Sequence, residues 1–354
     1  MKTTVTKAKA ILDKLAKNQL CGGAPQPVML WGPPGIGKSD LVRAVSKELG
    51  IELRDVRLAQ LDPVDLRGVP TVEDGQTKWA TPSFFPTDPE SAGILFLDEL
   101  SAADPSIQVA AYQLLLDRRV GEYAVPPRWI IVAAGNRAED NAVALPMSSA
   151  LTNRMMHLEL HAEPEEWARW AVRAGCDPSV IGFIRFRPEM LFAFGENCER
   201  GWPSPRSWER VSNILGVGLD DDELLPCVAG LVGDAAAAQF LAYRRRYKTL
   251  GSVRELMLDP GKPIKLDSHK PDVCYALASA RAYWVGRGES PAEAMQLLDG
   301  FFRLSLLLPP TFAVVAMIDA LESDKNGALA ERMTAHPDFA AWQTRFGDEM
   351  GKRR

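Results

Sequence analysis

Three short apolar runs in the first half of the chain predict buried strands. They are Val28–Trp31, Ile94–Leu97 and Trp129–Ala134, and each is followed at once by glycine or a charged residue. Continuous apolar runs of this length are typical of parallel strands that are covered on both faces. Between them, Asp40–Leu49 and Pro105–Arg118 place apolar residues at helical intervals. Strands that alternate with helices in this way indicate an open α/β sheet.

Helical periodicity dominates the second half of the chain. The predicted helices are Glu165–Ala174, Arg206–Gly216, Asp234–Tyr247, Pro271–Val285 and Pro291–Phe302. The stretch Gly251–Lys270 is rich in proline and glycine and predicts a connector. We therefore predict three regions: an α/β core over 1–161 that starts with a helix at Val5–Leu20, a helical region over 162–250, and a further helical segment over 251–354.

Charge and apolar content exclude several classes of protein. The net charge is −5, from 41 basic and 46 acidic residues, so no global field draws the chain to nucleic acid or anionic membranes, although a local basic groove stays open. The longest apolar stretch, Leu304–Ile318, is interrupted by Pro309 and Pro310 and is shorter than the roughly 20 residues of a membrane helix. We interpret it as buried helix.

The N-terminal lysines bear on where the protein resides in the cell, and the cysteines bear on disulfides and zinc sites. Lysines are spread through the first 17 residues, unlike a secretory signal, so we expect a cytoplasmic protein. The 5 cysteines include no CxxC pair, which argues against a disulfide framework or a zinc site.

A glycine-rich loop follows the first apolar run. Residues 32–39, GPPGIGKS, have the spacing Gly-x4-Gly-Lys-Ser, and a helical pattern follows directly. In a phosphate loop, glycines let successive backbone N–H groups converge on phosphate oxygens at the positive end of a helix. Lys38 would reach the β and γ phosphates and Ser39 would hold Mg²⁺. We expect the nucleotide to contact Gly32, Pro33, Pro34, Gly35, Ile36, Gly37, Lys38, Ser39 and Asp40. An ordinary Gly-Pro turn is the alternative.

The second apolar run ends in two carboxylates, Asp98 and Glu99. Asp98 would stabilise Mg²⁺ through its water shell. Glu99 could polarise the water that attacks the γ-phosphate, so the pair predicts ATP hydrolysis and not binding alone. The alternative is a strand that simply runs out into solvent.

The third apolar run ends in Gly135 and Asn136. In open α/β sheets, ligands lie beyond the carboxyl ends of the strands. Asn136 is therefore placed to orient the attacking water or to contact the γ-phosphate, unless it only forms a turn.

The order and intervals of these motifs resemble those of AAA+ ATPases, and most of all the MoxR-like branch. The resemblance rests on GPPGIGKS, on residues 65–68, on ILFLDEL, on VPPRWIIVAAGN and on SPRSWER. It implies an α/β parallel-sheet P-loop NTPase core, a helical lid over 162–250 and a C-terminal helical extension. It also implies assembly into a ring, usually a hexamer, with ATP and Mg²⁺ between neighbouring subunits.

A ring of this kind needs an arginine that reaches the neighbouring subunit's nucleotide. The resemblance favours Arg154, although its neighbours Asn153 and Met155 differ from the Asp-Arg-Phe setting of MoxR-like proteins. The rival arginines are Arg137, Arg128, Arg118 and Arg119. A plain surface arginine is the remaining alternative.

Arg206 lies in SPRSWER, where serine and proline mark a helix start. By resemblance it is the arginine that couples the lid to the γ-phosphate, in its own subunit or the neighbour's. A structural arginine at a helix end is the alternative.

Two insertions predict hairpins. Val69–Pro82 reads as two strands about an Asp-Gly turn, and Arg119–Pro127 precedes the third apolar run. MoxR-like ATPases also carry hairpins at these places, which project toward the pore or a partner. The candidate contact residues are Trp79, Phe84, Phe85 and Tyr123, unless these aromatic side chains only anchor the hairpins to the core.

The leading hypothesis is a Mg²⁺-dependent ATPase ring that remodels or activates a protein partner, by resemblance a von Willebrand factor A domain protein. One alternative is a nucleic-acid motor or restriction-type NTPase, for which the cluster Arg244–Arg246 with Lys248 would be the contact. The other is a scaffold whose assembly is switched by nucleotide binding.

Overall fold

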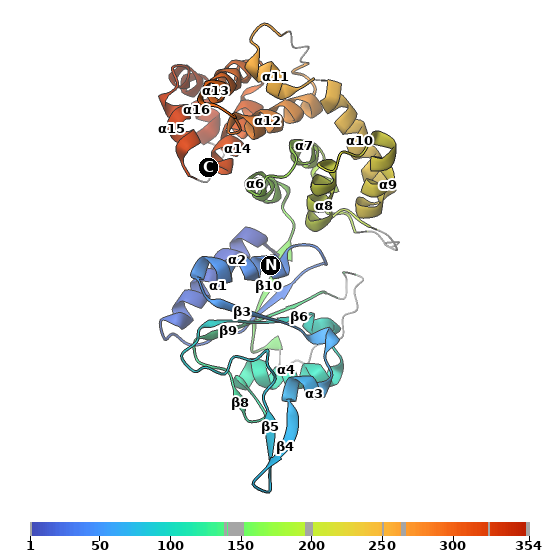
Figure 1. The fold of residues 1–354 in the computed structure, drawn as a ribbon, viewed down its shortest axis with the longest axis vertical. Coiled ribbons are helices and arrows are strands. Elements are labelled where there is room, and N and C mark those ends of the chain that lie inside the picture. The colour runs from blue at the N-terminus through green and yellow to red at the C-terminus, as the bar shows by residue number, and fades with distance from the viewer. Residues whose placement is uncertain are drawn as a thin grey trace. The chain divides into compact units, whose positions relative to one another are not determined.

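The computed structural model describes residues 2–137, 140, 152–194, 201–249, 251–262, 267–324 and 326–351. The chain forms two compact units, Met1–Glu163 and Pro164–Arg354, which we call the α/β unit and the helical unit (Figure 1).

A parallel six-stranded sheet forms the centre of the α/β unit. Its strand order is β1-β10-β2-β9-β6-β3. The strands are β1 Lys2–Thr4, β2 Val28–Trp31, β3 Glu52–Arg57, β6 Gly93–Asp98, β9 Trp129–Gly135 and β10 Met156–His161. The three predicted apolar runs lie in β2, β6 and β9, and β9 pairs with both of the others. The predicted α/β fold with a parallel sheet is therefore confirmed.

Helices cover both faces of this sheet (Figure 1). α1 Val5–Leu20 and α2 Lys38–Leu49 lie on one face, and α3 Pro63–Arg67 and α4 Pro105–Asp117 lie on the other, with single turns η1 Leu58–Gln60 and η2 Leu100–Ala102. Because successive strand residues point to opposite faces, Leu30 packs in the core under α1 and α2, while Met29 packs in the core with α4.

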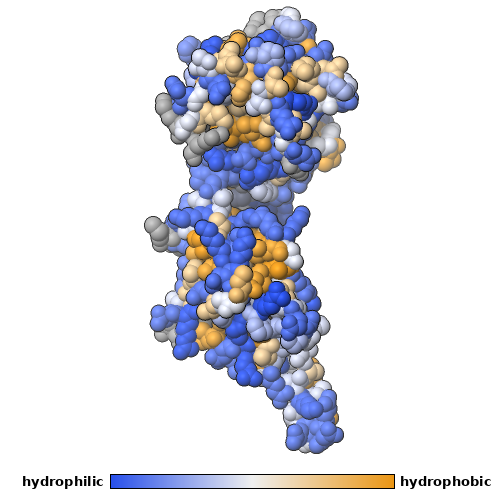
Figure 2. Space-filling model, turned by 90° about the vertical axis from the view of Figure 1, so that its left-hand side faces the viewer, coloured by the Kyte–Doolittle hydropathy of each residue, from blue (hydrophilic) through white to orange (hydrophobic). Residues whose placement is uncertain are grey.

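Both predicted hairpins are present. β4 Val69–Glu73 and β5 Gln76–Ala80 pair antiparallel about a turn in which Asp74 and Gly75 have φ of 52° and 73°. β7 Arg119–Val120 and β8 Tyr123–Ala124 form the shorter hairpin. The β4–β5 hairpin projects from the α/β unit in Figure 1, and Figure 2 shows its end as mostly hydrophilic surface.

The helical unit is built from packed helices. They are α6 Pro164–Ala174, α7 Pro178–Phe186, α8 Pro205–Leu215, α9 Asp221–Val232, α10 Asp234–Thr249, α11 Val253–Leu258, α12 Pro271–Val285, α13 Pro291–Ser305, α14 Pro310–Ser323, α15 Ala328–Ala335 and α16 Phe339–Gly351, with a single turn η4 Pro188–Met190. The five helices predicted after residue 163 correspond to α6, α8, α10, α12 and α13. The sequence analysis missed α7, α9, α11, α15 and α16, and α11 lies within the predicted connector. Nearly all side chains of α7 are buried, so it shows no polar face.

The apolar stretch Leu304–Ile318 holds two helices and not one. α13 ends at Ser305 and α14 begins at Pro310. Proline lacks the N–H that a continued helix would need, so it begins a new helix instead. No helix among the described residues is long and apolar enough to span a membrane.

A buried ion pair ties the helical unit together. Arg185 of α7 contacts Asp319 of α14 through Nη2 and Oδ1 at 2.8 Å, and Glu165 of α6 through Nη2 and Oε1 at 2.9 Å. The side chains of Arg185 and Asp319 are 2% and 1% exposed. α6 and α7 precede residue 250, where we predict a boundary, and α14 follows it, so these contacts join the two predicted helical regions. The division into three regions stays a prediction.

Candidate functional site

The glycine-rich loop connects β2 to α2 at the carboxyl edge of the sheet. Gly35 and Gly37 have φ of 80° and 102°, which glycine adopts without the steric cost of a Cβ. The N–H of Gly32 donates to the carbonyl of Gly135 at 3.3 Å, so the loop begins against the end of β9. Ile36 is 4% exposed and packs in the core, so its side chain anchors the loop.

Lys38 is the first residue of α2, and its ammonium lies inside the loop. Nζ donates to the carbonyl oxygen of Gly32, to that of Pro33 at 3.2 Å and to Oδ1 of Asn136 at 2.8 Å. The residue is only 9% exposed. The structure therefore brings together the loop lysine and the polar tip of β9, which are 98 positions apart in the sequence.

Ser39 and Asp98 form the oxygen pair that the sequence predicts for Mg²⁺. Oγ of Ser39 donates to Oδ2 of Asp98 at 2.9 Å, and Oδ1 of Asp98 accepts the N–H of Glu99 at 2.9 Å. Hydroxyl and carboxylate oxygens suit Mg²⁺, which uses few protein ligands together with water and substrate phosphates. The described residues contain no separate cluster of three or more His, Cys, Asp or Glu side chains that could hold a metal.

Glu99 has an unusual backbone conformation. Its φ is 60°, which is uncommon for a residue other than glycine, and such outliers concentrate at functional sites. Its half-buried carboxylate makes no hydrogen bond or ion pair with another described residue. Among the described residues, the group that we expect to act as a base thus has no partner that would hold it in another role.

Asn136 is held by a residue that the sequence analysis missed. Its backbone N–H donates to Oγ of Ser101 at 2.9 Å, and Ser101 is 1% exposed. Ser101 lies two positions after Glu99, and no motif in the sequence points to it.

Arg154 is exposed, and its side chain makes no hydrogen bond or ion pair with another described residue. The turn that carries it is fixed by His157, whose Nε2 contacts the carbonyl of Thr152 at 2.8 Å. Nδ1 of the same ring accepts from Nε1 of Trp31 at 2.8 Å, at the end of β2. An exposed side chain on a fixed turn is suited to reach a neighbouring molecule.

Two of the rival arginines are engaged within the chain. Arg137 pairs with Asp140 through Nη2 and Oδ1 at 2.7 Å and also with Glu159. Nη2 of Arg118 donates to the carbonyls of Pro126 and Trp129 at 2.8 and 2.7 Å, and burial lowers the pKa of Arg118. Both side chains therefore hold the α/β unit together.

The remaining charged candidates are exposed. Arg119 and Arg128 lie at the surface, with Arg128 donating to the carbonyl of Glu90 at 3.4 Å. The carboxylate of Asp40 pairs with Arg43 at 3.0 Å.

Arg206 belongs to the helical unit, in the first turn of α8. Ser204 caps this helix by accepting the N–H of Ser207 at 3.2 Å, and Pro205 is its first residue. The predicted helix start is confirmed. Arg206 is exposed, and its side chain has no hydrogen-bond or ion-pair partner among the described residues.

Most of the aromatic residues near the hairpins are anchors. Phe85 is 2% exposed and stacks on Tyr123 with ring centroids 4.5 Å apart, and Phe84 packs against the same core. The hydroxyl of Tyr123 donates to the carbonyl of Pro86 at 2.8 Å. Trp79, at 39% exposure, is the member of the predicted set with the most accessible surface.

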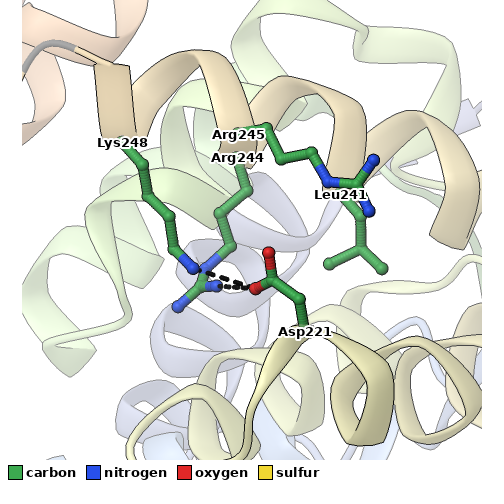
Figure 3. A pocket seen from close by; sticks show the side chains of 5 residues that line it. All are labelled: Asp221, Leu241, Arg244, Arg245 and Lys248. Atoms are coloured by element: carbon green, nitrogen blue, oxygen red, sulfur yellow. Dashed lines mark hydrogen bonds and ion pairs between the residues drawn. The ribbon is translucent and has the colours of Figure 1, made fainter.

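The basic cluster on α10 is largely paired with carboxylates. Arg244 and Lys248 converge on Oδ1 of Asp221 at 3.6 and 2.9 Å, whereas Arg245 extends away from it (Figure 3). Arg246 pairs with Asp272 at 2.6 Å. Pairing of this kind offsets much of the charge that a nucleic-acid contact would use.

Comparison with protein families finds a match within the α/β unit. Residues 27–155 match the model of the AAA domain, dynein-related subfamily. This stretch is similar to an AAA domain. It contains the loop, Asp98 and Glu99, Asn136 and Arg154.

Curated relatives are similar to this chain over a limited length. The chain is 36% identical to the rat (Rattus norvegicus) ATPase family gene 2 protein homolog B over 135 residues, which is 34% of this chain and 16% of the relative. The replication factor C large subunit of Ignicoccus hospitalis is 30% identical over 113 residues, or 31% of this chain and 22% of the relative. The chain thus spans less than a quarter of these relatives.

Solved structures give weaker similarities. The RuvB Holliday junction branch migration motor of Thermotoga maritima aligns with TM-score 0.38 and 17% identity over 72% of this chain and 73% of that one. A putative ATPase from Cytophaga hutchinsonii aligns with TM-score 0.35 and 13% identity over 82% and 79%.

Proposed function

We propose that this chain is a Mg²⁺-dependent ATPase that hydrolyses ATP at the loop of the AAA domain. The observation that carries the proposal is the pair of contacts Lys38–Asn136 and Ser39–Asp98, at 2.8 and 2.9 Å. Together they join the ends of β2, β6 and β9 at one place. A lysine and an amide positioned next to two metal-compatible oxygens suit the triphosphate of a nucleotide.

Each side chain has a distinct role in this proposal. Backbone N–H groups of the loop and the ammonium of Lys38 bind phosphate oxygens, and Asn136 orients the attacking water. Ser39 and Asp98 would hold Mg²⁺, which supplies neutralisation of phosphate charge. Glu99 accepts the proton of the attacking water, since its carboxylate has no hydrogen-bond or ion-pair partner among the described residues.

We further propose a ring of MoxR-like type, a hexamer, in which Arg154 of one subunit contacts the nucleotide of the next. The exposed position of Arg154 on a fixed turn supports this role, while Arg137 and Arg118 are committed to their own chain. The hexamer, the action on a protein partner and a von Willebrand factor A domain as that partner rest on the resemblance of the motifs. On the same resemblance, we propose that Arg206 couples the helical unit to the γ-phosphate of the nucleotide.

The Glu99→Gln variant tests hydrolysis. Loss of the general base should lower ATP turnover by about 10²–10⁴-fold while ATP binding is kept. The control is Glu90→Gln, the same chemical change at an exposed position just before β6, which should leave turnover unchanged. Full turnover in Glu99→Gln would contradict the assignment. A wild type that binds ATP but does not turn it over would favour a scaffold that needs only nucleotide binding.

Mixing of subunits tests the ring. Arg154→Ala chains should inhibit wild-type chains in mixed assemblies, because each arginine serves a neighbour's nucleotide. Arg119→Ala, at an exposed rival arginine of the same unit, shows which of the two arginines has this role. If the activity of the mixture is only the average of the two variants' activities, Arg154 does not have this role. In a separate assay, turnover that DNA stimulates in a salt-sensitive way would favour a nucleic-acid motor instead.

A further inference from the structure

Ser101 lies where two parts of the proposed site meet. It belongs to η2, the turn that follows Asp98 and Glu99, and it is 1% exposed. Its Oγ accepts the backbone N–H of Asn136 at 2.9 Å. One buried hydroxyl thus connects the chain segment after β6 to the residue at the end of β9.

The packing around Ser101 leaves little room for it to move. A Cβ on Gly135 would lie 2.7 Å from Oγ of Ser101 and 2.8 Å from Cε of Met29. The absence of a side chain at Gly135 is therefore what lets Ser101 approach β9 so closely. On the other side, the carbonyl of Gly135 accepts the N–H of Gly32. The end of β9 is held between the phosphate loop and Ser101.

We propose that Ser101 is a positioning residue for ATP hydrolysis, an inference that rests on the proposed function. Its hydroxyl fixes the backbone of Asn136, and Asn136 in turn contacts Lys38 at 2.8 Å. Ser101 acts through Asn136 and does not touch the substrate. Loss of the hydroxyl frees the Asn136 backbone, so the amide orients the attacking water less often.

The Ser101→Ala variant tests this role by separating turnover from binding. We expect kcat to fall by about 3–10-fold, the effect of losing one hydrogen bond, while KM and the Kd for ATP stay within about 2-fold of the wild type. The matched control is Ser91→Ala. Ser91 accepts Nε1 of Trp129 at 2.9 Å at the opposite end of the same strand, so its loss should leave kcat unchanged.

A double-mutant cycle shows whether Ser101 acts through Asn136. Ser101→Ala should lower kcat in the wild type but have no further effect in an Asn136→Ala background. Additive losses would overturn the inference, as would an equal loss of kcat in Ser91→Ala.

Two further readouts keep the test decisive. If Ser101→Ala fails to fold, Ser101→Cys can replace it, because the thiol is a weak acceptor of similar size. Its kcat should lie between that of the wild type and the lower value expected for Ser101→Ala. A Ser101→Cys variant that folds and has the wild-type kcat would overturn the inference. A wild-type protein that binds ATP without hydrolysing it would refute the proposed function itself. An active wild type with an unchanged kcat in Ser101→Ala would refute only the role of Ser101.

Discussion

The candidate site in the α/β unit and the core of the helical unit use charged side chains in opposite ways. In the α/β unit, Glu99 and Arg154 make no hydrogen bond or ion pair with other described residues. In the helical unit, Arg185 and Asp319 are almost fully buried and bonded to one another. Charges that hold a fold are neutralised by partners in the same chain, whereas charges that act on a substrate or a neighbour must stay available.

Arg281 of the helical unit is a buried charged residue that has no ion pair with another described residue. The residue is fully buried, and Nη1 donates to the carbonyl of Phe301 at 2.9 Å and to Oγ of Ser305 at 2.6 Å. Its guanidinium also lies 4.4 Å from the centroid of the Phe301 ring. Burial lowers the pKa of Arg281 to about 9. An arginine placed in this way serves packing between α12 and α13.

The largest effect on stability should come from Arg185→Ala. It leaves the carboxylate of Asp319 buried without its partner, which should cost about 3–5 kcal/mol of unfolding free energy. Urea denaturation followed by tryptophan fluorescence measures this cost. The double variant Arg185→Met with Asp319→Leu removes both charges and should recover much of the loss. Equal losses of unfolding free energy in the single and double variants would show that Arg185 and Asp319 do not stabilise the fold by neutralising each other's charge.

Lys38→Ala should act on function instead. Loss of the ammonium should lower ATP turnover by about 10²–10³-fold, because a preorganised positive donor next to the phosphates is removed. Lys47→Ala is the control, since Lys47 lies exposed in the last turn of the same helix. Turnover assays at saturating ATP measure the difference. Equal activities in the two variants would show that Lys38 does not contribute to ATP turnover.

A smaller effect is expected from Ser204→Ala, which removes the N-cap of α8 next to Arg206. The lost cap should cost about 1 kcal/mol of stability. The shift of the urea midpoint measures it, and an unchanged midpoint would show that the cap is dispensable.

The smallest effect is expected at the hairpin. Trp79 is 39% exposed, so Trp79→Ser should change the unfolding free energy by less than about 0.5 kcal/mol. The buried Trp129, at 0% exposure, provides the contrast, because Trp129→Ala should cost about 3–5 kcal/mol. A large loss of stability in Trp79→Ser would mean that this hairpin carries part of the core.

The local patterns of the chain determined the main strands and the phosphate loop. β2, β6 and β9 were predictable because an apolar run is a local property of a buried strand. The loop was predictable because its glycines and lysine must stand at fixed intervals. β3 was not predictable, because its sequence ELRDVR is mostly polar and only its pairing with β6 makes it a strand.

Contacts between distant residues were decided by the tertiary structure alone. Arg185 and Asp319 are 134 positions apart, and no pattern in the sequence near either residue predicts its partner. The same holds for Ser101 beside Asn136, and for Arg137 beside Glu159, an ion pair that distinguishes Arg137 from the exposed Arg154. Periodicity and spacing report the conformation of a segment, whereas the partner of a side chain depends on how separate segments pack.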